Sequence, residues 1–163
     1  MGWMRFCMTM AMLAGIPNLR PATGASSETL KELQERFDHE SNAVHKAKQM
    51  QKLGDAQFAA LHDAEHTEDF SAAGVILEKY RDNVRVAFEG LKKEHPDAER
   101  QSNGYRQLQM HVQRGIKEAS DALREAPDAL KPPLNLVLGD LMAMDAEMLK
   151  LLFPSPPHHN DKP

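Results

Sequence analysis

The apolar residues of this chain recur at intervals of three and four positions, and no other feature constrains the fold as strongly. On an α-helix these intervals place side chains along one face, which must be buried against another element. One such stripe lies between Asp69 or Ser71 and His95, and a second ends at Pro127. The first comprises Ala73, Leu77, Tyr80, Val84, Phe88 and Leu91, and the second comprises Tyr105, Leu108, Val112, Ile116, Ala119, Leu123 and Ala126. The spacing therefore predicts two long amphipathic helices.

Stripes on either side of these two predict further helices. Ser27 can cap a first helix, and the polar stretch Asp38–Asn42 is a point at which it can split in two. Gly54 and Asp55 predict a bend, followed by a short helix that ends near His66. The N-terminal stripe contains Leu30, Leu33, Phe37, Val44, Ala47 and Met50, the short helix buries Phe58 and Leu61, and the C-terminal stripe contains Leu134, Leu138, Leu141, Met144, Met148 and Leu151. Pro132 and Pro133 suit the first turn of this last helix, which Pro154 ends.

The predicted fold class is all-α. Beyond residue 25 no stretch alternates β-branched or aromatic residues with polar ones at period two, so we expect no strands. Narrow stripes near a 3.5-residue spacing favour long helices packed in the manner of a coiled coil. We expect an antiparallel helical bundle of about four long helices, and the polar stretch Asp38–Asn42 allows the first to be split. The second long helix begins either at Asp97 or after Ser102, Asn103 and Gly104.

The first 25 residues are typical of a secretory signal peptide. Arg5 precedes the apolar stretch Phe6–Ile16, Pro17 ends it, and small residues lead to a cleavage site after Ala25. The apolar stretch has 11 residues, whereas a membrane-spanning helix needs about 20. We therefore expect export to the periplasm or the exterior, with no membrane span.

The domain after the leader is predicted to cover residues 26–153, and residues 154–163 to form a disordered tail. The only cysteine, Cys7, lies in the leader, so no disulfide is expected afterwards. Loss of residues 1–25 removes Arg5 and Arg20 and no acid, so the net charge changes from −4 to −6. This sign argues against nucleic acid as a partner, because phosphate binding requires a basic surface.

The sequence contains no recognisable catalytic arrangement. It has no cysteine after the leader, no Gly-x-Ser-x-Gly motif and no glycine pair spaced to hold a phosphate. The paired Glu-x-x-His motifs of di-iron bundles are also missing, and Asp63 with His66 gives a single half-site at best. We therefore expect a protein that is not an enzyme and has no cofactor.

The strongest alternative is a metal site formed by His62 and His66. Four positions apart on a helix, the two imidazoles project from one face and can bind a single Zn²⁺ or Cu²⁺. Zinc sites in proteins usually have three or four ligands, so completion requires Asp69, His45 or His111. The competing interpretation is that both are solvated histidines near a helix end.

Several segments together resemble a family of exported α-helical proteins from environmental bacteria. The resemblance covers most of the chain after residue 25 and implies neither an activity nor site residues. The segments are Lys52–Phe58, Tyr80–Arg85, His95–Arg100, Gly104–Leu108, Lys131–Leu134 and Leu152–Pro154.

By elimination, the sequence predicts an exported helical protein that acts through protein–protein contacts as an accessory, scaffold or chaperone-like subunit. Its protein partner is not identified, and a homodimer is one possibility because two long hairpins can bury each other's stripes. A metal-binding or metal-sensing bundle that uses His62 and His66 is the alternative.

Overall fold

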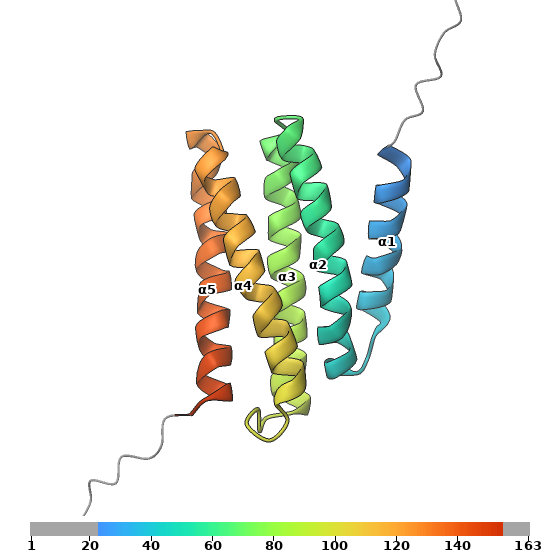
Figure 1. Cartoon of the computed structure of the whole chain (residues 1–163), viewed down its shortest axis with the longest axis vertical. Helices are drawn as coiled ribbons and strands as arrows, with labels where there is room; N and C mark the ends of the chain where they lie inside the picture. The colour runs from blue at the N-terminus through green and yellow to red at the C-terminus, as the bar shows by residue number, and fades with distance from the viewer. Residues whose placement is uncertain (1–22, 155–163) are drawn as a thin grey trace, which may run out of the picture.

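The computed structural model describes residues 23–154, which form five α-helices and contain no strand (Figure 1). The helices are α1 (Thr23–His39), α2 (Ala43–His66), α3 (Phe70–Glu94), α4 (Ser102–Glu125) and α5 (Lys131–Leu152), with a single 3₁₀ turn, η1 (Asp128–Leu130), before α5. The predicted all-α class is confirmed. Residues 1–22 of the predicted leader and residues 155–163 of the predicted tail lie outside the described residues.

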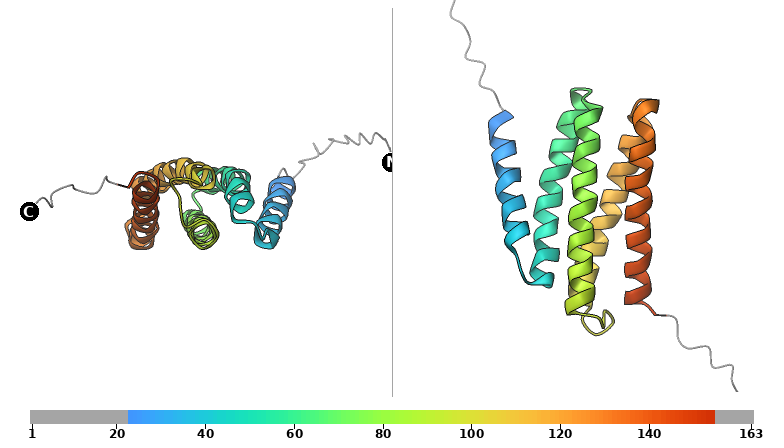
Figure 2. Two further views of the ribbon diagram at one scale, coloured as in Figure 1. Left: turned by 90° about the horizontal axis from the view of Figure 1, so that it is seen from below. Right: turned by 180° about the vertical axis from the view of Figure 1, so that it is seen from behind.

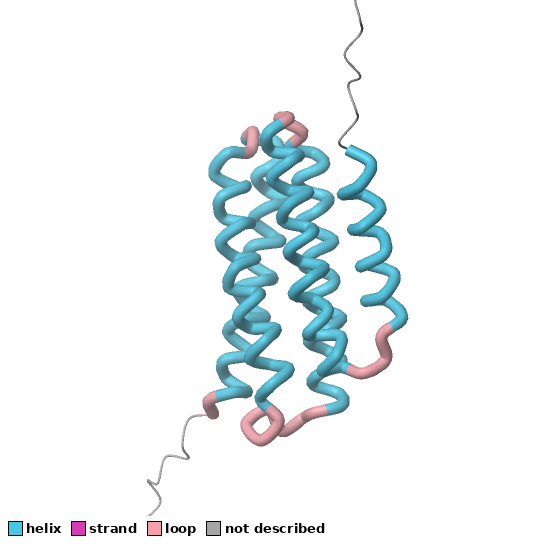
Figure 3. Tube along the Cα trace, turned by 45° about the vertical axis from the view of Figure 1, so that its right-hand side comes forward, coloured by secondary structure: helices cyan, strands magenta, loops and turns pink. Residues whose placement is uncertain are grey.

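The five helices lie in two layers. Seen along the helices, α1, α3 and α5 form one layer and α2 and α4 the other (Figure 2). The loops lie at the two ends of the molecule, so the chain reverses direction from one helix to the next (Figure 3). Within each layer, however, α2 packs on α4 and α3 packs on α5, and these neighbours run in the same direction. The arrangement is therefore not antiparallel throughout, because lateral neighbours are parallel.

The predicted split of the first helical segment is confirmed at residues 40–42. Asn42 caps α2 with its side-chain oxygen, which accepts a hydrogen bond from the backbone NH of His45 at 2.9 Å. Asp69 caps α3 in the same way, accepting from the NH of Ala72 at 3.0 Å. Such caps satisfy backbone donors that have no partner inside the helix, so these polar residues fix where α2 and α3 begin.

The predicted bend at Gly54 and Asp55 is wrong, because α2 continues unbroken to His66. Gly54 lies inside the helix, where the ring of His111 from α4 packs against it and would overlap a Cβ atom. Glycine disfavours a helix interior by about 1 kcal/mol relative to alanine. Gly54 is therefore explained by packing, because it leaves room for the side chain of His111 on α4.

The predicted stripes form the core. Every member of the α3 stripe is buried, and the stripes of α4 and α5 are buried or half-buried. Phe58 of α2 contacts Tyr80 of α3 with ring centroids 4.8 Å apart, and Phe88 meets Tyr105 edge to face at 6.2 Å. None of the helices in residues 23–154 combines the length and apolar character needed to cross a bilayer.

Candidate functional site

His62 and His66, the predicted metal ligands, both lie in the last two turns of α2 and are exposed. His62 forms a hydrogen bond across the interface between α2 and α4, since its Nε2 lies 2.7 Å from Oε2 of Glu118 on α4. His66 is in the final turn. The structure thus brings a carboxylate to His62 and leaves His66 at the helix end.

The residues proposed to complete the metal site lie elsewhere. His45 is in the first turn of α2, at the other end of that helix, and Asp69 caps α3. His111 packs on Gly54, two turns before His62. Within residues 23–154, no group of three or more histidine, cysteine, aspartate or glutamate side chains is close enough together to hold a metal ion. The metal site stays a prediction that rests on two ligands.

Several acidic side chains lie near Glu65, three positions after His62, on the face shared by α2 and α4. Partial burial raises the pKa of Glu65 above its ordinary value, His62 opposes this shift, and the nearby acids Glu125, Glu118 and Asp121 add to it. The acids of α4 therefore repel Glu65 of α2, whereas the hydrogen bond between His62 and Glu118 joins the two helices here.

A buried pair of polar rings lies deeper between α2, α3 and α4. The hydroxyl of Tyr80 donates to the backbone carbonyl oxygen of His111 at 3.0 Å, and the hydroxyl oxygen lies 3.0 Å from Nδ1 of the same histidine. Phe58 stacks on the imidazole, with ring centroids 5.4 Å apart and planes 9° apart. His111 is 8% exposed and Tyr80 fully buried, so this pair is closed to substrate-sized molecules.

Charged side chains continue from this pair to the surface. Nε2 of His111 lies 3.6 Å from Oδ1 of Asp55, which is too long for a hydrogen bond but close enough for an ion pair if the ring is protonated. Asp55 pairs with Arg114 at 2.6 Å, and Arg114 lies 3.7 Å from Glu118, the partner of His62. The guanidinium also lies over the ring of Phe58. These contacts join α2 to α4 over about two turns of each helix.

Burial, the strongest effect, lowers the pKa of His111 below its ordinary value, and the neighbouring Asp55 carboxylate partly opposes the shift. Burial also raises the pKa of Tyr80 far above its usual range. At neutral pH both rings are therefore uncharged. The contacts of the Tyr80 hydroxyl join α3 to α4, and the packing of the imidazole on Phe58 and Gly54 adds α2 to the same cluster.

His111 was predicted from the sequence only as a candidate metal ligand, and its burial was not predicted. The available clue is the pair of helical glycines that face the two rings. Gly54 makes room for His111, and Gly115 makes room for Tyr80, whose ring would overlap a Cβ atom there. A glycine inside an otherwise strong helical pattern indicates a close neighbour.

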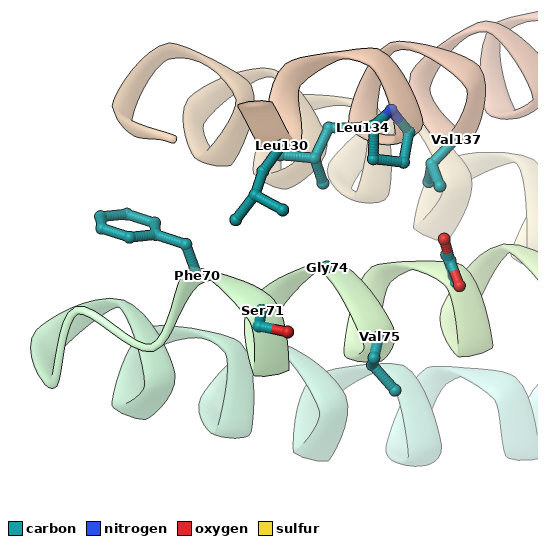
Figure 4. Close-up of a pocket in the computed structure, with 9 residues that line it drawn as sticks. Phe70, Ser71, Gly74, Val75, Leu130, Leu134 and Val137 are labelled. Carbon is teal, nitrogen blue, oxygen red and sulfur yellow. The ribbon is translucent and has the colours of Figure 1, made fainter. Parts of the chain in front are cut away.

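The outer surface of α3 carries two apolar grooves. The first lies between α3 and α5 and has a volume of about 170 Å³; Figure 4 shows its side chains. The second lies between α1 and α3, with α2 as its floor, and has a volume of about 380 Å³. The first groove is lined by Phe70, Ser71, Gly74, Val75, Glu78, Leu130, Pro133, Leu134 and Val137, and the second by Leu30, Lys31, Gln34, Glu35, Gln57, Val75, Ile76 and Lys79.

Val75 belongs to both grooves and is 64% exposed. Three turns further along α3, Val86 is 51% exposed on the same side of the helix. Between them lie the exposed charged residues Glu78, Lys79 and Asp82. We call this surface, from Val75 to Val86 with its two grooves, the α3 face.

The floor of the second groove contains a buried amide. Gln57 is only 2% exposed, and its Oε1 accepts no hydrogen bond from any of the described residues, 23–154. A buried acceptor without a donor costs about 1–3 kcal/mol. The groove is thus mainly apolar and lies over a buried amide whose oxygen is closed to the surface.

Comparison of the chain with known protein families, with curated proteins and with solved structures finds no match. The comparisons therefore assign no function to the chain, and the resemblance to exported helical proteins stays a prediction.

Proposed function

We propose that this protein is an exported, non-enzymatic helical protein that binds another protein through the α3 face. The partner contributes apolar side chains to the two grooves beside Val75. The buried polar residues, including His111 and Tyr80, hold α2, α3 and α4 in place behind that face.

The observation that carries the proposal is the position of Val75. An exposed valine is ordinary by itself, but this one lines two apolar grooves at once. A helix laid beside it would bury apolar side chains in either groove, the mode by which amphipathic helices are commonly recognised.

The helix arrangement explains why this surface is open. We infer that α2 to α5 pack as a bundle in which consecutive helices are antiparallel, with α1 added against α2. In that arrangement α3 lies between α1 and α5 in the outer layer, and no helix of residues 23–154 lies over its outer side in Figure 2.

Photo-crosslinking in cells tests the proposal. A photoreactive amino acid replaces Val75 in one variant and Ser120, an exposed residue of α4, in the control. We expect discrete crosslinked species from position 75 that are absent from position 120, and their loss when Ile76, which also lines the second groove, is changed to Asp. No product at position 75, or the same products at both positions, would contradict the proposal.

Export is tested separately by mass spectrometry of the protein from its native cells. We expect a chain that begins near Ser26. Because α1 starts at Thr23, cleavage after Ala25 removes three residues from its first turn. Retention of residues 1–25 would refute export while leaving the binding proposal intact.

A further inference from the structure

We propose that the α3 face binds a second copy of this chain, with α3 of one copy antiparallel to α3 of the other. The inference rests on the proposed function, since it names the occupant of the same surface. The supporting observation is the order of exposed apolar and charged residues along α3. When a second copy of α3 runs in the opposite direction, valine meets valine and lysine meets aspartate.

The complementarity follows from the spacing of four exposed residues. Val75 and Val86 lie equally far from a point between residues 80 and 81, and so do Lys79 and Asp82. A two-fold axis that lies in the interface, perpendicular to α3 and level with that point, therefore brings Val75 to the level of Val86 of the second copy and Lys79 to the level of Asp82. Each contact occurs twice, as an isologous interface requires.

The charges on α3 are available for this pairing. The ion pairs of Asp82 with Arg81 and Arg85 both use Oδ1. Among the described residues, Lys79 forms no ion pair, although its neighbours on α3 do. The second copy thus supplies a carboxylate to a lysine that lacks one.

The apolar side chains fit the same register. Val86 of the second copy lies against Val75, between the two grooves that Val75 lines. The two-fold axis also brings α1 opposite α1 and α5 opposite α5, so the whole outer layer of three helices contributes to the interface (Figure 2). This breadth matters because a single helix pair buries less area than a stable dimer needs.

Sedimentation of the full chain with charge-reversal variants tests the pairing. The unmodified chain is expected to be a dimer, and Lys79→Asp or Asp82→Lys alone should weaken the dimer by about tenfold or more, because like charges then face each other. The double variant should recover the dimer, and an equal mixture of the two single variants should form a heterodimer. Lys117→Asp on α4, far from this face, should leave the dimer unchanged.

Cysteine crosslinking tests the register. In a Cys7→Ser background, an equal mixture of Val75→Cys and Val86→Cys chains should form an inter-chain disulfide, and neither variant should do so alone. A full chain that stays monomeric at all concentrations, a double variant no better than the single ones, or equal crosslinking by Val75→Cys alone would overturn the inference. A monomeric chain whose position 75 still crosslinks to another protein would refute the second copy alone and leave the proposed function standing.

Discussion

At the scale of single residues, two glycines and two rings determine how closely α2, α3 and α4 approach. The ring of His111 occupies the space beside Gly54, and the ring of Tyr80 occupies the space beside Gly115. The hydrogen bond between the rings depends on both spaces. Each glycine therefore stabilises the fold although glycine disfavours a helix.

Gly54→Ala and Gly115→Ala should each destabilise the protein by about 1–3 kcal/mol, because the added methyl group overlaps a buried ring that has little freedom to move. The matched control is Gly139→Ala on α5, where nothing lies within 4 Å of the added atom. That change should stabilise the protein by up to about 1 kcal/mol. Urea unfolding distinguishes the outcomes, and equal effects at all three positions would disprove the close packing.

The buried His111 should make stability depend on pH. Burial lowers its pKa in the folded state, so the unfolded chain takes up a proton first as the pH falls through the ordinary value of 6.5. Stability is therefore full above that pH and decreases below it. Between neutral pH and about pH 5.5, where most carboxylates are still ionised, the unmodified protein should lose more unfolding free energy than His111→Gln. His45→Gln, at an exposed position, should behave like the unmodified protein. An unchanged pH dependence in His111→Gln would contradict this account.

Zinc should bind weakly. His62 has a carboxylate partner on α4, and His66 lies at the end of α2, so at most two of the usual three or four ligands are in place. Calorimetric titration should give a dissociation constant above about 10 μM, equivalent to roughly −7 kcal/mol. Tighter binding that disappears in His62→Ala and His66→Ala would instead establish the metal site.

At the scale of elements, one apolar stripe determines which face of each helix is buried, and local capping residues and prolines determine where the helix begins and ends. Val84 lies in the middle of the α3 stripe and is fully buried, whereas Glu89 lies on the opposite, exposed side. Polar caps begin α2 and α3, and prolines end the helical pattern after α4 and allow α5 to begin.

Val84→Asp should therefore cost several kcal/mol, because it places an unpaired charge in the core. Glu89→Gln should change the unfolding free energy by less than about 1 kcal/mol, since its pairing with Lys92 is at the surface. The two melting temperatures test this assignment, and identical values would show that the faces of α3 are assigned wrongly.

Stripes and stop signals were enough to predict α3 and α5 to within a residue or two, because both signals are local in sequence. The bend predicted at Gly54 was wrong because this glycine makes room for His111, which lies on another helix. For the same reason it did not foresee the burial of His111 or the groove over Gln57, since both depend on which helices become neighbours. The candidate metal ligands were placed correctly on one helix, but the residues meant to join them were not.

At the scale of the whole molecule, the two-layer arrangement leaves the outer side of α3 exposed between α1 and α5 (Figure 2). Val75 and Val86 are exposed there, while the equivalent stripe on the inner side is buried. A protein that acts through contacts needs a stable scaffold and one open surface, and this arrangement provides both.

Covalent footprinting of the protein in its native cells tests the central claim, that the α3 face is covered by protein when the molecule functions. A diazirine reagent labels exposed side chains, and mass spectrometry compares the labelling in cells with that of dilute purified protein. We predict that peptides from Phe70–Glu94 are labelled several-fold less in cells, while the exposed side of Lys117–Arg124 on α4 is labelled equally in both. Equal labelling of α3 in the two conditions would contradict the claim.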